Sequence, residues 1–240
     1  MLTIVTQFDT DFFDWALLSL ESLKIADPEA SFFGYAVNLT SDQLLRANTS
    51  GMKLVCDKID FSAFTLPEKK AFMANRRASV ACLAMKDLNP KDDDIIVIAD
   101  ADILYRKKLV DLRNLMEKVD VGCIFRDGMW NGKTYNHLKV ACGFVALKKT
   151  GNELVILWDI LMKCNTSSLY GIQPNQWYWD QVTLLKAIEI LNALSYAKLE
   201  HDTYVNRDFD ENAVAWSAHK PPKELMFEKF NIELGRMKNG

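Results

Sequence analysis

The 240-residue sequence is short of cysteine, and the way its cysteines are spaced excludes the common cysteine-based sites. The five cysteines are widely separated and odd in number, and no two of them form a Cys-x-x-Cys pair. Neither a zinc-binding ribbon nor a disulfide framework is therefore predicted. Four of them lie within apolar segments, where a free thiol behaves as a small hydrophobic side chain. We therefore expect reduced, mostly buried thiols and a cytoplasmic location.

Long apolar runs and a strong charge of either sign are also missing. No run approaches the roughly 20 apolar residues that a transmembrane helix needs, and the first residues lack the basic and apolar regions of a signal peptide. The net charge is only −3, so composition gives no general attraction to nucleic acid. Hydrophobic residues make up 49% and charged residues 25%, which is typical of a globular protein that closes its core without disulfides or metals.

Over the first 125 residues, short β-rich segments alternate with longer helical patterns. Strands are expected at 2–6, 32–37, 53–56, 94–99 and 121–125, and helices at 11–25, 42–47, 67–88 and 107–118. This alternation predicts an α/β fold with a mostly parallel sheet. The polar segment 126–139 is typical of a functional loop. Further strands are expected at 140–147, 197–199 and 214–216, and helices at 151–164 and 175–194. No repeat or linker interrupts the chain, which favours one domain over residues 1–240.

The most apolar expected strand ends at a pair of acidic residues, Asp100 and Asp102. In open α/β sheets, ligands bind beyond the carboxyl ends of the strands. Carboxylate oxygens at this position suit Mg²⁺ or Mn²⁺, ions that bridge diphosphate oxygens. The alternative is an ordinary turn with two solvated acids, since Asp-x-Asp occurs in many proteins. We expect a metal site, with both carboxylates facing solvent.

Together with this pair, four further segments make the chain resemble the GT-A fold of nucleotide-sugar glycosyltransferases, distantly the glycogenin-like enzymes. The helix upstream contains Asn-Arg-Arg at 75–77, and the segment 142–147 is similar to the strand beneath the donor sugar. The segment 179–181 resembles the Asp-Gln motif, and 217–221 resembles the late motif with a metal-binding histidine and a diphosphate-binding lysine. The chain departs from that pattern at Cys142 and in the late motif, where Lys220 directly follows His219. Either Lys220 or Lys223 could therefore serve the diphosphate.

The resemblance implies a role for each of these residues. His219 would complete a metal site with Asp100 and Asp102, and Asp180 and Gln181 would act at the sugar or acceptor. Thr6 and Asp9, at the end of the first expected strand, are candidates for base or ribose contacts. The remaining donor contacts would be Arg76, Arg77, Asp100, Ala101, Gly143, Lys220 and Lys223.

Each assignment has a plainer alternative. His219 would otherwise be a surface histidine, and one of the two arginines would face solvent. Three aromatic residues at 177–179 precede Asp180; they either form a core cluster or stack on a sugar face beside its carboxylate.

The sequence thus predicts a GT-A domain with a nucleotide-binding half at 1–125 and a sugar and acceptor half at 126–240. It would use Mn²⁺ or Mg²⁺ to transfer a sugar from a UDP- or GDP-sugar to a glycan, protein or lipid acceptor, and the resemblance at His219 favours retention of configuration. One alternative is a nucleotidyltransferase, although the segment 7–11 is acidic and lacks the glycine-rich loop of that class. Another is a non-catalytic protein that binds nucleotide sugars.

Overall fold

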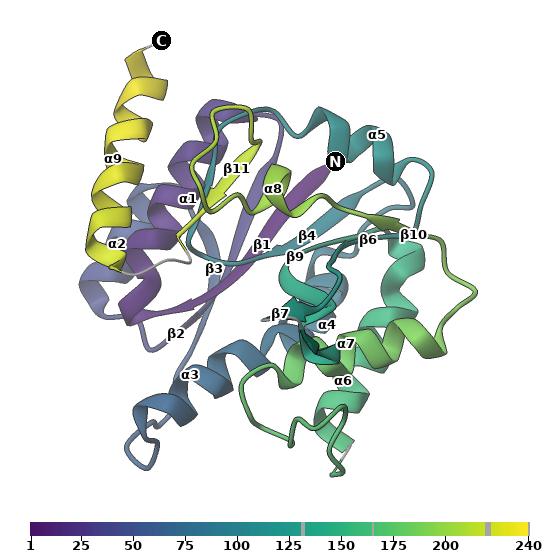
Figure 1. Cartoon of the computed structure of the whole chain (residues 1–240). Helices are drawn as coiled ribbons and strands as arrows, with labels where there is room; N and C mark the ends of the chain where they lie inside the picture. Colours follow the sequence, from purple (N-terminus) through teal and green to yellow (C-terminus); the bar gives the residue numbers. More distant parts are fainter. Residues whose placement is uncertain (131–132, 165, 219–221, 240) are drawn as a thin grey trace. The chain divides into compact units, whose positions relative to one another are not determined.

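The computed structural model describes residues 1–130, 133–164, 166–218 and 222–239 (Figure 1). The chain forms two compact units, and each is assembled from segments that are far apart in the sequence. The first unit comprises Met1–Ile59, Ala99–Arg113 and Glu200–Gly240, and the second comprises Asp60–Ile98 and Asn114–Leu199.

Three parallel strands form the sheet of the first unit, in the order β1, β2, β3. Every residue of β1 except Gln7 is buried, which explains its run of apolar and β-branched residues. Side-chain oxygens cap the helices that follow: Asp9 caps η1 ahead of α1, and Thr40 forms a capping box with Gln43 at α2. The elements are β1 (Leu2–Asp9), η1 (Thr10–Phe12), α1 (Phe13–Ala26), β2 (Ser31–Val37), α2 (Ser41–Thr49) and β3 (Lys53–Asp57).

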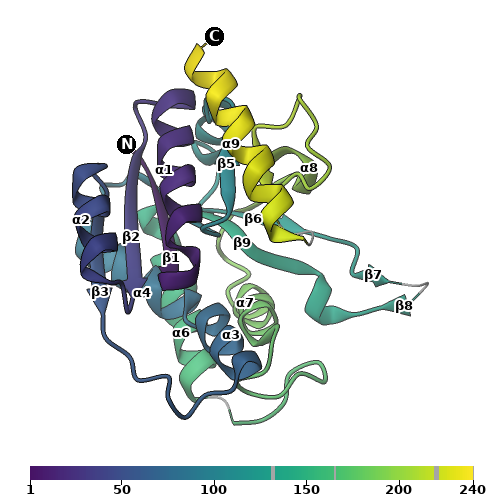
Figure 2. The ribbon, with the colours of Figure 1, turned by 90° about the vertical axis from the view of Figure 1, so that its left-hand side faces the viewer.

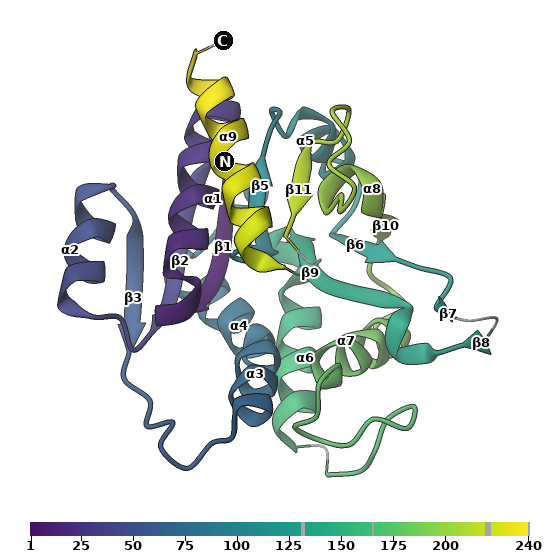
Figure 3. The ribbon, with the colours of Figure 1, turned by 60° about the vertical axis from the view of Figure 1, so that its left-hand side comes forward.

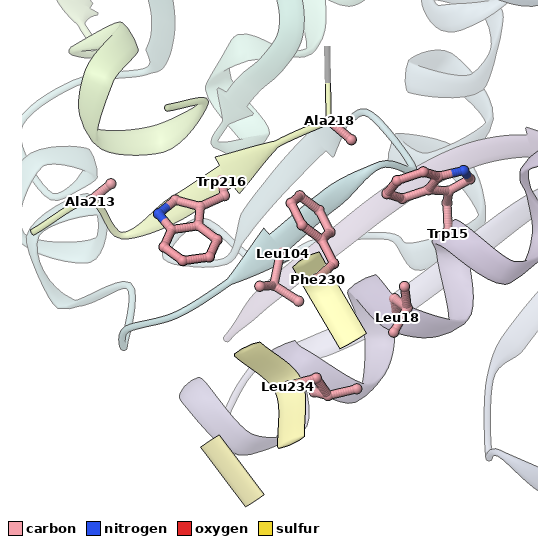
Figure 4. Packing of buried hydrophobic residues seen from close by; sticks show 8 residues of the cluster. All are labelled: Trp15, Leu18, Leu104, Ala213, Trp216, Ala218, Phe230 and Leu234. Atoms are coloured by element: carbon pink, nitrogen blue, oxygen red, sulfur yellow. The ribbon is translucent and has the colours of Figure 1, made fainter. Parts of the chain in front are cut away.

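The remaining elements of this unit come from the middle and the end of the chain. Strand β5 pairs antiparallel with β11, which joins segments more than a hundred residues apart. Helix α9 packs along α1 in both side views (Figures 2 and 3), and a hydrophobic cluster centred on Trp15, Trp216 and Phe230 lies between these elements (Figure 4). The elements are β5 (Ile103–Tyr105), α8 (His201–Tyr204), β11 (Ala215–Ser217) and α9 (Lys223–Asn239); α5 (Val110–Met116) begins here and ends in the second unit.

The main sheet of the second unit has the strands β10, β6, β9 and β4, in that order. Strands β10 and β6 are parallel, and β6 and β9 are antiparallel. Helix α6 packs on α4 and α7. The elements are α3 (Leu66–Asn75), α4 (Arg77–Leu88), β4 (Ile95–Ala99), β6 (Val121–Phe125), β7 (Met129–Trp130), β8 (Lys133–Thr134), η2 (Asn136–Leu138), β9 (Val140–Leu147), η3 (Lys149–Gly151), α6 (Asn152–Cys164), α7 (Trp179–Ile190) and β10 (Tyr196–Lys198).

The expected α/β class with a mostly parallel sheet is confirmed. The elements β5, α8 and α9 were not expected, and the other differences lie at helix boundaries and in one loop. The helix expected at 67–88 is divided into α3 and α4 at Arg76, whose backbone stays in the helical region. The helix expected from 175 begins only at Trp179, because Asn175 and Tyr178 have positive φ angles of 64° and 73° that a right-handed helix excludes. The expected loop at 126–139 also contains β7, β8 and η2.

All five cysteines are free thiols, as expected, but only Cys123 and Cys142 are buried, while Cys164 is exposed. In the part of the chain that the structure describes, no helix has both the length and the apolar character needed to cross a membrane.

Candidate functional site

The acidic pair follows β4 directly, and its two carboxylates differ in exposure. All five residues of β4 are buried. Asp100 is half-buried, whereas Asp102 is 9% exposed. The expectation that both carboxylates face solvent is therefore wrong for Asp102. Its backbone oxygen accepts a hydrogen bond from the Ala218 amide (3.0 Å), next to the β5–β11 pairing, and this bond holds the turn in place.

A lysine from the start of α9 neutralises Asp102. Lys223 Nζ forms an ion pair with Oδ2 of Asp102, and its ammonium group also lies 5.0 Å from the ring centre of Phe12 and 5.4 Å from that of Trp15. Aromatic faces attract a cation, so the two rings hold the ammonium beside the carboxylate. The structure thus brings together two predicted site residues, Asp102 and Lys223, that are 121 positions apart.

Asp100 influences a buried tyrosine of β5. Burial, with a smaller contribution from the negative charge of Asp100, raises the pKa of Tyr105 well above its usual range. The phenol therefore stays protonated at any physiological pH. Ala101, between the two acids, is 5% exposed and packs into the same turn.

The predicted base or ribose contacts lie in β1. Asp9 ends the strand and is 5% exposed; its carboxylate Oδ1 accepts hydrogen bonds from the amides of Asp11 (3.1 Å) and Phe12 (3.3 Å). Its evident role is therefore a cap that fixes the entry to α1. Thr6 is 1% exposed, and its hydroxyl oxygen makes no hydrogen bond within the described part of the chain. A buried hydroxyl in this state is unusual.

In the second unit, Arg77 and Asp180 form a buried ion pair, although their side chains come from different helices, α4 and α7. The side chain of Asp180 is only 2% exposed and that of Arg77 is 17% exposed. The backbone of Asp180 is also held, because its amide donates to Asn75 Oδ1 (3.2 Å) and its carbonyl accepts from Trp158 Nε1 (2.9 Å). The pair is therefore part of a connected buried network.

The other predicted residues of this unit lie on elements around that network. The Gln181 side-chain amide, in the orientation that satisfies its neighbours, donates to the carbonyls of Val140 (2.6 Å) and His137 (3.2 Å) and so ties α7 to β9. Gly143 is half-buried within β9, and Arg76 is half-buried between α3 and α4. The donor contacts of Gly143 and Arg76 stay predictions.

Two of the predicted residues, His219 and Lys220, lie outside the described residues. The last described position before them is Ala218, whose amide is bonded to Asp102. Within the described ranges, no group of three or more His, Cys, Asp or Glu side chains is arranged to hold a metal ion. The described oxygen donors of the predicted metal site are therefore Asp100 and Asp102.

Sequence reasoning missed four residues that support the candidate site. Phe12 and Trp15 hold Lys223, while Asn75 and Trp158 fix the backbone of Asp180. Phe12 and Trp15 lie in the helix expected at 11–25, but that pattern did not indicate a cation partner.

Comparison with known proteins identifies the fold. No protein-family model matches the chain, and no curated protein matches its sequence. Solved structures do match. The galactosyltransferase LgtC, solved in complex with donor and acceptor sugar analogues, has 13% identity and a TM-score of 0.57, over 98% of this chain and 95% of its own. GlyE, a glycosyltransferase of Streptococcus pneumoniae, has 12% identity and a TM-score of 0.57, over 99% of this chain and 63% of its own.

A third match is a glycosyltransferase involved in glycosylation of the major capsid of PBCV-1, with 11% identity and a TM-score of 0.54 over 96% of this chain and 98% of its own. At such low identity the likeness concerns the fold. The expected resemblance is confirmed at that level: the chain is an α/β protein with the GT-A fold of these glycosyltransferases.

Proposed function

We propose that the chain is a glycosyltransferase that moves a sugar from a UDP- or GDP-sugar to an acceptor hydroxyl of a glycan, protein or lipid. The observation that carries this proposal is the acidic pair after β4, with Lys223 against Asp102, in a chain with the GT-A fold. The five free thiols support a reducing, cytoplasmic setting.

The acidic pair fits a divalent cation in its donor chemistry. Asp100 and Asp102 supply the carboxylate oxygens that Mn²⁺ and Mg²⁺ prefer, and the Lys223 contact engages Oδ2, one of the two oxygens of Asp102. His219 is the proposed third ligand. When bound, such an ion would stabilise the negative charge of the departing diphosphate.

The protein's own residues would bind and orient the reactants. Lys223, whose ammonium group lies near two aromatic rings, would neutralise phosphate oxygens beside Asp102. Asp180 and Gln181 would orient the sugar or acceptor, with retention of configuration. Asp180 would act on the sugar or acceptor while its carboxylate stays ion-paired with Arg77. The ion pair would therefore fix the orientation of the carboxylate before the substrate binds.

Hydrolysis of nucleotide sugars tests the proposal directly. We expect release of the nucleoside diphosphate from at least one UDP- or GDP-sugar in Mn²⁺ and none in a chelator. Asp100→Asn and Asp102→Asn should each lower the rate about 100-fold or more. Asp93→Asn provides a matched control, because it removes an exposed carboxylate just before β4. Full activity in either site variant would refute the assignment.

One observation favours a second candidate, a non-catalytic protein that binds nucleotide sugars. Both Asp102 and Asp180 are already ion-paired, which is how a protein that no longer uses these carboxylates would keep them buried. Such a protein would show saturable binding of the nucleotide sugar by calorimetry but no metal-dependent hydrolysis or transfer.

A further inference from the structure

The second unit contains a cavity of about 630 Å³ that none of the roles proposed above explains. It lies among α3, α4, the end of α6 and the segment before α7, elements that pack together in the two side views (Figures 2 and 3). Its size is that of a typical site for a small ligand. Its principal described lining residues are Phe64, Phe72, Asn75, Arg76, Lys163 and Asn175.

Aromatic rings form one wall of this cavity. Phe64 and Phe72 pack edge to face at 5.7 Å, and Phe61 packs edge to face against both, at 5.4 Å and 5.6 Å. This mutual packing fixes the rings, yet Phe64 remains 39% exposed. A fixed, partly exposed ring at a cavity wall offers an apolar face on which a ligand can stack without further ordering of the protein.

The remaining lining is mixed, because the apolar side chains of Ala63 and Met162 lie beside polar ones. The amides of Asn75 and Asn175, together with the hydroxyl of Ser79, bring hydrogen-bonding groups to the cavity. A ligand that meets both an aromatic face and amide groups carries apolar C–H groups on one side and hydroxyls on the other. This combination describes a sugar ring.

The charges of the lining indicate that the ligand is neutral. Lys163 forms an ion pair with Asp159 (2.7 Å), so its charge is already balanced. Arg76 and Glu68 contribute opposite formal charges to the same lining. The cavity therefore lacks the excess of positive charge that recognition of a phosphate or diphosphate requires.

We propose that this cavity binds a neutral saccharide, as the part of a glycan acceptor that lies beyond the reacting hydroxyl. The inference rests on the proposed transferase function. Asn75 supports it, because this cavity residue also accepts the hydrogen bond from the Asp180 amide. A sugar chain held in the cavity thus contacts the residue that fixes the backbone of the proposed sugar-binding carboxylate.

The test uses the full-length chain on an array of neutral, sulfated and phosphorylated oligosaccharides, followed by calorimetry with the best neutral binder. Phe64→Ala should weaken that binding about tenfold, because it removes one stacking face. Asn175→Gly, which tolerates the positive φ angle of 64° at that position, should weaken it by removing an amide of the lining. Leu66→Ala is the matched control, since Leu66 is 62% exposed, lies two residues from Phe64 and is not part of the lining. Hydrolysis of the nucleotide sugar without acceptor should be equal in all variants.

The outcomes separate this inference from the proposed function. If wild-type protein hydrolyses the donor but binds no neutral saccharide, or binds it equally well after Phe64→Ala, the cavity proposal is wrong and the transferase proposal stands. Preference for sulfated or phosphorylated saccharides would also overturn it. If saccharide binding depends on Phe64 but no donor is hydrolysed, the cavity is a saccharide site and the transferase proposal, with the acceptor role, is wrong.

Discussion

Several buried carboxylates in the described part of the chain are matched to basic side chains. Asp27, fully buried, forms an ion pair with Arg113, and Glu233 forms one with Arg106. Asp180 with Arg77 follows the same pattern. Desolvating a carboxylate costs several kcal/mol, so a buried acid is tolerated only with a partner and hydrogen bonds. The same physics makes a variant of one partner disruptive in two ways, by lost chemistry and by lost stability.

Asp180→Asn should therefore lower both activity and stability. The substitution removes the negative charge that Asp180 presents to the mostly buried Arg77, which should cost roughly 3–5 kcal/mol of unfolding free energy. Urea denaturation followed by circular dichroism measures this loss. Calorimetry with the nucleoside diphosphate and Mn²⁺, at a temperature where the variant is folded, shows whether product binding survives.

A double-mutant cycle separates the two effects. Adding Arg77→Met to Asp180→Asn removes both partners of the ion pair and should recover much of the lost stability. Transfer activity should stay low if Asp180 acts on the sugar or acceptor. Recovery of activity together with stability would show that the carboxylate serves only the fold.

Lys223→Met should alter metal binding and diphosphate binding in opposite directions. Removal of the ammonium lowers repulsion between Lys223 and a cation at Asp102, so Mn²⁺ should bind about 2–5-fold more tightly, within the roughly 1 kcal/mol typical of a partly exposed pair. The nucleoside diphosphate should bind more weakly. Lys238→Met is the control, because Lys238 is also on α9 and forms an exposed ion pair, with Glu21 of α1. Unchanged Mn²⁺ affinity in calorimetry would contradict the predicted metal site.

At the scale of elements, hydrophobic patterning predicted most strands and helices. The apolar run of β4 and the alternation of strands with helices identified the sheet, because burial on both faces leaves little freedom of composition. The start of α7 was missed, since its limit is the positive φ angle of Tyr178, a residue type that rarely adopts one. The pairing of β5 with β11 was also missed, because each strand has only three residues and its partner is remote.

Helix α9 offers a test of how far a single aromatic contact holds an element. Phe230 is 1% exposed and packs edge to face against Trp15 at 5.5 Å (Figure 4). Phe230→Ala should destabilise the protein by roughly 3–5 kcal/mol, because it leaves a cavity in that cluster. Ile232→Ala, two residues away and 53% exposed, should cost less than about 0.5 kcal/mol. Equal unfolding midpoints for the two variants in urea would show that α9 does not depend on this cluster.

At the scale of the whole molecule, the sequence indicated which residue types carry chemistry but not how they pair. Asp102 and Lys223 are 121 positions apart, and Arg77 and Asp180 are 103 apart. Each pair depends on how distant elements pack, which local patterns do not encode. The resemblance assigned Arg77 to the donor and Asp180 to the sugar or acceptor, whereas the structure joins them to each other. Both ligand roles stay predictions that the variants above can decide.

The dependence of the unfolding free energy on pH reports on three buried or partly buried groups that lie on different elements. Burial raises the pKa of Cys123 to about 12, and burial with smaller contributions from nearby charges raises the pKa of Tyr196 and Tyr204 to about 12. In the unfolded chain these groups ionise nearer pH 9–10, so the unfolded state releases protons first as the pH rises. The stability they contribute is therefore complete below about pH 9 and is lost progressively toward pH 12.

At pH 10.5, Cys123 alone should account for a loss of roughly 2 kcal/mol relative to pH 7.5. Urea unfolding at the two pH values measures the difference, and Cys123→Ala should reduce it by about that amount. An equal difference in the variant would mean that the Cys123 thiol ionises as readily in the folded protein as in the unfolded chain.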